Sequence, residues 1–232
     1  MDRELIKKAF WRSVPVSVGY IIIGIGFGIV LQDAGYGLGW ALAMSLFIYA
    51  GSMQYVGVSL IAAPACLLTA FLTTLTVNAR HIFYSLSMLK KYGDTGAYKP
   101  YLIFALTDET YALLVEEPEE DRERHRQFCL FVSLFNHIYW VLGTAIGSIF
   151  AAALPFDTNG ISFSMTALFV ASFTEQWLSG RSRLSGLIGL LVTVVCRLLF
   201  GRDLFLIPSM VLITLLLLML RPRLEKGENG HD

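Results

Sequence analysis

Charged residues are scarce in this chain. Of 232 residues, 16% are Asp, Glu, Lys or Arg, against roughly 25% in ordinary soluble domains, while 55% are apolar or aromatic and the mean hydropathy is +0.61. A helix needs about 20 apolar residues to cross a bilayer, which gives this chain room for about seven or eight crossings and no separate soluble domain. The composition therefore predicts an all-α polytopic membrane protein that forms a single transmembrane domain.

Cysteine and an excess of one charge are also lacking. Cys66, Cys129 and Cys196 are odd in number and far apart, so no disulfide framework is expected and they are interpreted as small core residues. Eighteen basic residues balance eighteen acidic ones, which argues against a nucleic-acid-binding face. The sequence has no His or Cys spacing typical of a metal or haem site and no nucleophile elbow. We therefore expect no metal, no cofactor and no enzyme activity.

Apolar segments alternate with short polar stretches along the whole chain. A nine-residue piece, His81 to Leu89, is too short to cross as a straight helix, so it is a half-helix, a re-entrant segment or the start of a broken helix. The hydrophilic stretch Glu116 to Gln127 is expected to be a water-exposed connector. The apolar segments lie at about residues 14–32, 38–60, 61–78, 100–115, 128–154, 161–178, 184–200 and 203–220.

Lys and Arg near the span ends predict the orientation. If the piece at 81–89 enters the membrane without crossing it, the basic residues at 3–12, 122–126, 181–183 and 221–226 all fall on the cytoplasmic side. Both termini are then cytoplasmic. The first apolar run is of full membrane length and is not closed by a cleavage site, so it is interpreted as a retained helix rather than a signal peptide.

The chain also aligns with itself. A shift of 122 residues places Gln54 on Gln176 and Arg80 on Arg202, and a shift of 119 places Gly24 and Gly28 on Gly143 and Gly147. This pattern predicts two related halves, at about 14–91 and 128–220, joined by a connecting helix and loop at about 98–127 and followed by a cytoplasmic tail at 221–232. Whether the halves are parallel or inverted is left open. Either arrangement predicts a functional centre between the halves, near the membrane midplane.

Asp108 and Glu109 lie inside an apolar segment, where a charge costs roughly 2.5–3.5 kcal/mol even on lenient insertion scales. In one interpretation a helix begins near Thr107 and both carboxylates lie in its first turn, where the helix dipole favours them. In the other, one carboxylate exchanges a proton or pairs with a substrate ammonium. Adjacent helical positions point about 100° apart, so only one of the two can face a central cavity squarely.

Arg80 lies between Asn78 and His81, at the junction of two apolar pieces. It could extend to the interface without a further role. Alternatively, it is a bidentate partner for a carboxylate of the protein or of a substrate. Its counterpart in the second half, Arg202, is followed by Asp203 and has a possible ion pair of its own.

Gln54 follows Gly51 and Ser52, a place where a helix can loosen and expose backbone groups. The matching region of the second half contains Glu175 and Gln176. These groups either line a site or act as hydrogen-bonding contacts between helices, with Glu175 at the cytoplasmic interface. The glycines at 24–28 suit close helix packing and not a nucleotide, because no strand precedes them.

Several of these motifs occur together in one family. Pro15, the glycine run 24–28, Tyr49-Ala50-Gly51-Ser52-Met53-Gln54, Asn78-Ala79-Arg80-His81 and Leu106-Thr107-Asp108-Glu109 occur in this order in AzlC branched-chain amino acid permeases, which the chain resembles over nearly its full length. The resemblance implies the large subunit of an exporter in a bacterial or archaeal cytoplasmic membrane. It also implies a separate small hydrophobic partner of the AzlD type.

Together with these polar groups, the resemblance implies a secondary transporter that exports valine-, leucine- or isoleucine-like amino acids, with proton entry as a candidate driving reaction. Arg80 would hold the substrate carboxylate, and Asp108 or Glu109 would alternate between the ammonium and a proton. Ser52, Gln54 and Asn78 would supply neutral hydrogen bonds. The alternative is a non-transporting scaffold or sensor subunit, in which the same polar groups only join helices. The candidate site residues are Ser52, Gln54, Asn78, Arg80, His81, Asp108, Glu109, Glu175, Gln176 and Arg202.

Overall fold

The computed structural model describes residues 3–62, 66–93, 95–115, 122–153, 170, 173–174, 177, 183–205, 208–209, 211–217 and 219–220. All regular elements in these ranges are helices, which confirms the all-α prediction. Within the described residues, three helices are long and apolar enough to cross a membrane: Arg3–Asp33, Glu123–Ala153 and Leu184–Gly201. The total of seven or eight spans remains a prediction. The chain divides into two compact units, Met1–Met165 and Thr166–Asp232, which are described separately below.

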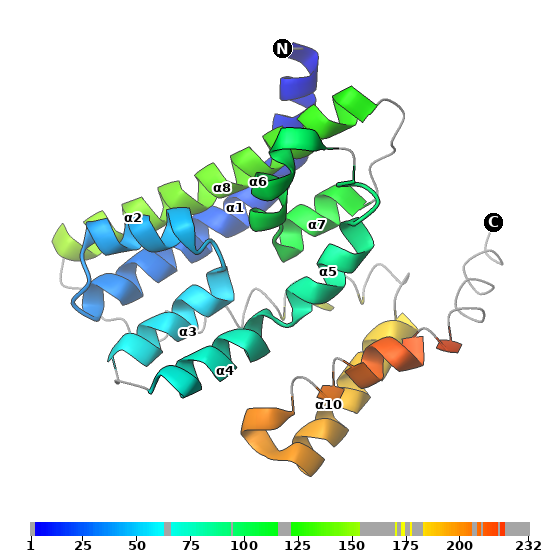
Figure 1. Ribbon diagram of the computed structural model, residues 1–232. Helices are drawn as coiled ribbons and strands as arrows, with labels where there is room; N and C mark the ends of the chain where they lie inside the picture. Colours follow the sequence, from blue (N-terminus) through cyan, green and yellow to red (C-terminus); the bar gives the residue numbers. More distant parts are fainter. Residues whose placement is uncertain are drawn as a thin grey trace. The chain divides into compact units, whose positions relative to one another are not determined.

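The first unit is built on two long helices, α1 (Arg3–Asp33) and α8 (Arg122–Ala153), which lie side by side (Figure 1). Near one end, the rings of Phe10 and Phe135 meet edge to face with centroids 5.6 Å apart. At the other end, the Ser148 hydroxyl donates a hydrogen bond to Gln32 Oε1 over 3.1 Å. Because the residue numbers of the contacting pairs rise together, α1 and α8 run parallel.

Glycines bring the two backbones together at the centre of this contact. A β-carbon on Gly24 would lie 3.0 Å from the backbone nitrogen of Thr144, and one on Gly143 would lie 2.6 Å from the carbonyl oxygen of Ile21. Gly28 and Gly147 leave still less room against the facing backbone. Small residues spaced four apart allow this approach in a membrane, where dispersion rather than water exclusion joins helices. The structure confirms the prediction of close helix packing at Gly24 and Gly28.

The other α-helices described in this unit are six shorter ones, α2 to α7, which follow one another in three consecutive pairs (Figure 1). The first is α2 (Leu38–Phe47) with α3 (Gly51–Ala62), the second is α4 (Leu67–Asn78) with α5 (Arg80–Met88), and the third is α6 (Lys99–Phe104) with α7 (Asp108–Val115). A short 3₁₀ turn, Gly96–Tyr98, precedes α6. No member of these pairs exceeds 12 residues, which is too short to cross a bilayer alone.

Each pair has an identifiable break. Tyr49 adopts a left-handed conformation with φ 45°, unusual for a bulky side chain, and ends the helical run after α2. At Ala79 the backbone hydrogen bonds span three residues instead of four, from Ala79 N–H to Thr76 and from Ile82 N–H to Ala79, and this turn separates α4 from α5. Residues 105–107 separate α6 from α7.

The breaks revise several predicted segments. The segments 38–60 and 100–115, expected as continuous, are each two helices, and α3 extends to Ala62 where a new segment was expected at residue 61. The piece at 81–89 corresponds to α5, a helix of nine residues that follows α4 directly after the break at Ala79. Whether it is a half-helix, a re-entrant segment or part of a broken helix stays a prediction.

The polar connector is shorter than expected. α8 begins at Arg122, so a water-exposed loop over 122–127 was a wrong prediction. Glu123 accepts hydrogen bonds from Arg126 and Gln127, three and four residues ahead, and these pairs favour helix. His125 on the opposite face is buried. Of the cysteines, Cys129 and Cys196 are buried as expected, but Cys66 is exposed just before α4.

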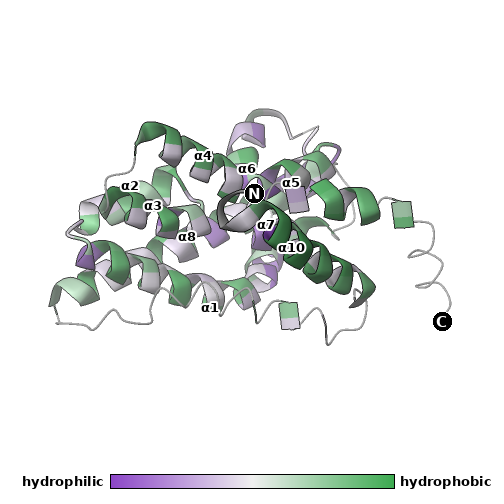
Figure 2. Cartoon of the chain, turned by 90° about the horizontal axis from the view of Figure 1, so that it is seen from below, coloured by the Kyte–Doolittle hydropathy of each residue, from purple (hydrophilic) through white to green (hydrophobic). Residues whose placement is uncertain are grey.

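In the second unit, α10 (Arg183–Leu204) is the main described helix. Gly201 has a φ of 75°, a left-handed conformation that glycine adopts at little cost, and it interrupts the helix close to its end. Figure 2 shows hydrophobic residues along nearly all of α10. Phe173 and Trp177 pack near Gly186 on one face of this helix. Most of the predicted segment 161–178 and the tail 221–232 lie outside the described residues.

Candidate functional site

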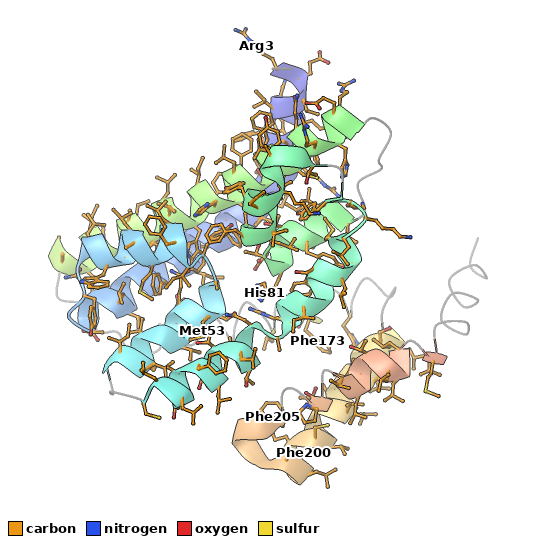
Figure 3. All side chains as sticks on the ribbon, in the orientation of Figure 1. Arg3, Met53, His81, Phe173, Phe200 and Phe205 are labelled. Atoms are coloured by element: carbon orange, nitrogen blue, oxygen red, sulfur yellow. The ribbon has the colours of Figure 1, made fainter. Side chains whose placement is uncertain are left out.

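The N-terminal ends of α3, α5 and α7 meet in the first unit (Figure 1). These helices begin at Gly51, Arg80 and Asp108, directly after the three breaks. Figure 3 labels Met53 on α3 and His81 on α5, which mark two of the three ends. A helix N-terminus presents unpaired backbone N–H groups and about half a positive charge. The convergence therefore creates a region that favours an anionic group.

Arg80 joins the three helix ends. Its Nη1 donates a hydrogen bond to Asp108 Oδ2 over 2.5 Å, and its Nη2 donates to the Ser52 hydroxyl. The guanidinium thus points at polar partners within the protein. It bridges two helices through separate nitrogens, whereas the sequence suggested a bidentate pair with one carboxylate. The Arg80 and Asp108 side chains keep 23% and 27% of their surface exposed, so the pair remains open to a small solute.

Glu109 has a different set of partners from its neighbour. The Tyr20 hydroxyl of α1 donates to Glu109 Oε2 over 2.8 Å and also lies 2.5 Å from the Thr107 hydroxyl oxygen. The Thr107 and Thr110 hydroxyl oxygens are 3.0 Å apart, and the Asn136 amide of α8 donates to Thr110 over 3.0 Å. Both carboxylates lie in the first turn of α7, as one interpretation expected. Their directions differ because adjacent helical positions diverge.

Gln54 belongs to another network. Its Oε1 accepts a hydrogen bond from the Trp140 indole over 3.0 Å, and its Nε2 donates to Ser45 over 3.4 Å. Ser45 in turn donates to Thr144 over 3.0 Å. Gln54 is fully buried. The structure therefore places this side chain between α2, α3 and α8, and does not bring it to Arg80.

Asn78 and His81 flank the break at Ala79. A ring nitrogen of His81, Nδ1, lies 3.1 Å from the Asn78 carbonyl oxygen. The side-chain oxygen of Asn78 is buried, and no described residue forms a hydrogen bond with it. These residues thus adjoin the Arg80 cluster along the chain without bonding to the Arg80 guanidinium.

The second-half candidates remain predictions. Glu175 and Gln176 lie outside the described residues. Arg202 falls within α10, but its side chain is outside the described part. Elsewhere, no group of three His, Cys, Asp or Glu among the described residues could hold a metal ion.

The sequence did not predict a role for Tyr20, Ser45 or Asn136. Tyr20 bonds to Glu109, Asn136 bonds to Thr110 in the same network, and Ser45 bonds to Gln54. Tyr20 was hidden in an apolar run. One signal could have identified it: Tyr20 lies one turn before Gly24, on the helix face that the glycines bring against α8. Ser45 and Asn136 carried no comparable signal, because isolated small polar residues are common in transmembrane helices.

Comparison with known proteins gives the family. The AzlC protein family model matches residues 15–154, a range that contains the three breaks and the Arg80 cluster. The chain belongs to the AzlC family. The branched-chain amino acid transport protein AzlC of Bacillus subtilis is 40% identical over 222 residues, covering 96% of this chain and 87% of that protein.

Other relatives of this AzlC family member come from several bacteria. An uncharacterized membrane protein of Helicobacter pylori is 40% identical over 96% of this chain and 97% of its own length. The inner membrane protein YgaZ of Escherichia coli is 26% identical over 68% of each chain. No solved structure matches the chain.

Proposed function

We propose that this AzlC family member is a secondary transporter that exports branched-chain amino acids across the cytoplasmic membrane. The observation that carries the proposal is the Arg80–Asp108 pair, held open at the meeting point of three helix N-termini. A partly exposed pair of opposite charges matches a zwitterion. The name of the Bacillus subtilis relative, a branched-chain amino acid transport protein, supports the substrate class.

In the proposed mode of binding, the amino acid inserts into the ion pair. Its carboxylate takes the place of Asp108 at Arg80 and also benefits from the positive ends of α3, α5 and α7. Its ammonium pairs with the Asp108 carboxylate. Ser52, which already accepts a hydrogen bond from Arg80, keeps the guanidinium oriented while the partners exchange. The side-chain oxygen of Asn78, which has no hydrogen-bond partner among the described residues, lies next to the break at Ala79 and could accept a further hydrogen bond from the ammonium.

The proposal also includes the second half of the chain, a partner subunit, an orientation in the membrane and a driving reaction. In the second half, Glu175, Gln176 and Arg202 would supply further polar groups to transport, in the manner of transporters built from repeats. A small hydrophobic AzlD-type subunit would complete the complex, and both termini would be cytoplasmic. Proton entry would drive export. The single transmembrane domain with seven or eight spans belongs to the same proposal.

The test is efflux of labelled valine or leucine from loaded cells, with and without the small partner. Asp108→Asn should abolish efflux while the protein still reaches the membrane. Glu123→Gln is the matched control, because it neutralises a carboxylate in an exposed helical pair with Arg126, away from the cluster. Unchanged efflux in Asp108→Asn would contradict the proposed site. If the unmodified protein and its variants all lack solute flux, and the substitutions only lower thermal stability, the protein would instead be a scaffold or sensor subunit.

A further inference from the structure

A chain of hydroxyl groups runs from Glu109 into the contact between α1, α7 and α8. In order, the groups are the Glu109 carboxyl, Tyr20, Thr107, Thr110 and the Asn136 amide. Successive heavy atoms are 2.8, 2.5, 3.0 and 3.0 Å apart. Tyr20 and Thr110 are buried, so Tyr20 depends on Glu109 and Thr107 for its hydrogen bonds, and Thr110 depends on Thr107 and Asn136.

Counting hydrogens shows what this chain can accommodate. The three links between Glu109, Tyr20, Thr107 and Thr110 need three hydrogens, and each hydroxyl supplies one. With Glu109 protonated, the carboxyl donates to Tyr20, Tyr20 to Thr107 and Thr107 to Thr110, which is the direction of the Thr107–Thr110 bond in the structure, and Thr110 also accepts from the Asn136 amide. With Glu109 ionised, Tyr20 donates to the carboxylate, and the Thr107–Thr110 bond reverses so that Thr107 can donate to Tyr20. Every link is then satisfied in both states, because a hydroxyl can donate or accept by rotating.

Glu109 and Asp108 differ in the charged groups that surround their carboxylates. The titratable groups that face Glu109 are Tyr20 from α1, Tyr49 at the α2–α3 break, Arg80 and Tyr84 from α5, and Asp108 from α7. The one cation in that set, Arg80, forms its ion pair with Asp108. Among the described residues, Glu109 has no ion pair of its own. An ionised Glu109 therefore gives the cluster a net charge of −1, and a protonated one makes it neutral, which suits a membrane interior.

We infer that Glu109 is the group that binds and releases the coupling proton, and that the Tyr20, Thr107 and Thr110 hydroxyls hold its carboxyl in both protonation states. This inference rests on the proposed transport function. A hydronium ion on the outer side gives one proton to a Glu109 oxygen and becomes water. The Glu109 O–H bond later breaks, and the proton passes to a water molecule on the cytoplasmic side, which becomes hydronium. Asp108 stays ionised, paired in turn with Arg80 and with the substrate ammonium.

The two carboxylates therefore have different roles, and transport measurements can separate them. Inverted membrane vesicles from cells that express the full chain expose its cytoplasmic face, so export becomes uptake. Labelled valine uptake driven by an acidic interior measures coupling. Exchange of labelled for unlabelled valine, without a pH gradient, measures substrate binding and passage. Vesicles lacking the chain provide the blank.

Glu109→Gln should lose the stimulation by the pH gradient and retain exchange, because the Arg80–Asp108 pair is untouched. Glu123→Gln, the exposed carboxylate control, should retain both activities. Full gradient stimulation in Glu109→Gln would overturn the inference, as would an Asp108→Asn variant that loses stimulation but keeps exchange. Absence of valine exchange in the unmodified protein would instead refute the proposed function.

A spectroscopic measurement covers the case in which Glu109→Gln is inactive. Infrared spectra of the purified full chain should contain the carbonyl stretch of a protonated carboxyl at neutral pH. Glu109→Gln should remove this band, and Tyr20→Phe should shift its frequency, because the phenol hydroxyl contacts the carboxyl. A band that both variants leave unchanged would show that Glu109 is not the protonated group.

Discussion

Gly143 of α8 lies against Ile21 of α1, where a β-carbon on the glycine would come within 2.6 Å of the Ile21 carbonyl oxygen. Backbone lies on both sides of this contact, so neither helix can yield by turning a side chain. The parallel α1–α8 pair therefore depends on glycine at this position. The same pair carries Tyr20 and Asn136, which reach the candidate carboxylate.

Gly143→Ala should destabilise the protein. Overpacking a close contact costs typically about 1–3 kcal/mol, and we expect the upper part of that range because backbone is the obstacle. Gly24→Ala, where the nearest backbone atoms are 3.0 Å away, should cost less. Gly189→Ala on α10 meets nothing within 4 Å and should be neutral or stabilising. Thermal unfolding in detergent measures all three; equal effects would contradict the packing explanation.

Removing one partner of the Arg80–Asp108 pair should cost more stability than removing both. Breaking a fully buried pair costs about 3–5 kcal/mol, and we expect less here because both side chains are about a quarter exposed. The double variant Arg80→Gln, Asp108→Asn should be more stable than Asp108→Asn alone. Valine exchange should be absent in all of them. A double variant that exchanges valine normally would show that the pair has only a structural role.

Gln54→Ala should affect stability and not substrate passage. The change leaves the Trp140 indole N–H without its 3.0 Å acceptor, and hydrogen bonds between membrane helices contribute about 1 kcal/mol. Valine exchange in vesicles should persist at temperatures below unfolding. The companion variant Trp140→Phe with Gln54→Leu removes both partners and should recover part of the loss. Exchange lost at full stability would place Gln54 in the binding site instead.

Lys91→Met should loosen the end of α7. The Lys91 ammonium donates to the carbonyl oxygens of Leu114 and Val115 over 2.9 and 2.6 Å, where the helix leaves carbonyl groups unpaired. We expect a loss of about 1 kcal/mol in thermal unfolding and faster amide exchange in α7. The adjacent Lys90 is exposed, so Lys90→Met is the matched control and should change neither measurement.

Local patterns in the sequence were sufficient for some features of the site. The placement of Asp108 and Glu109 in a first helical turn follows from polar residues interrupting an apolar run, and the close packing at Gly24 follows from glycine spacing. The start of α8 at Arg122 was missed, because hydropathy registers the polarity of residues 122–127 and not their helical ion pairs.

By itself, the sequence determined the membrane class, the helical secondary structure and the short set of costly polar groups, because hydropathy and helix-capping chemistry are local. Only the tertiary structure decided how those groups are paired. Arg80 meets Asp108 across 28 residues, Glu109 meets Tyr20 across 89, and Gln54 meets Trp140 across 86. Such pairings depend on where three helices break and on which faces the glycines bring together, and a linear pattern contains neither distance nor direction.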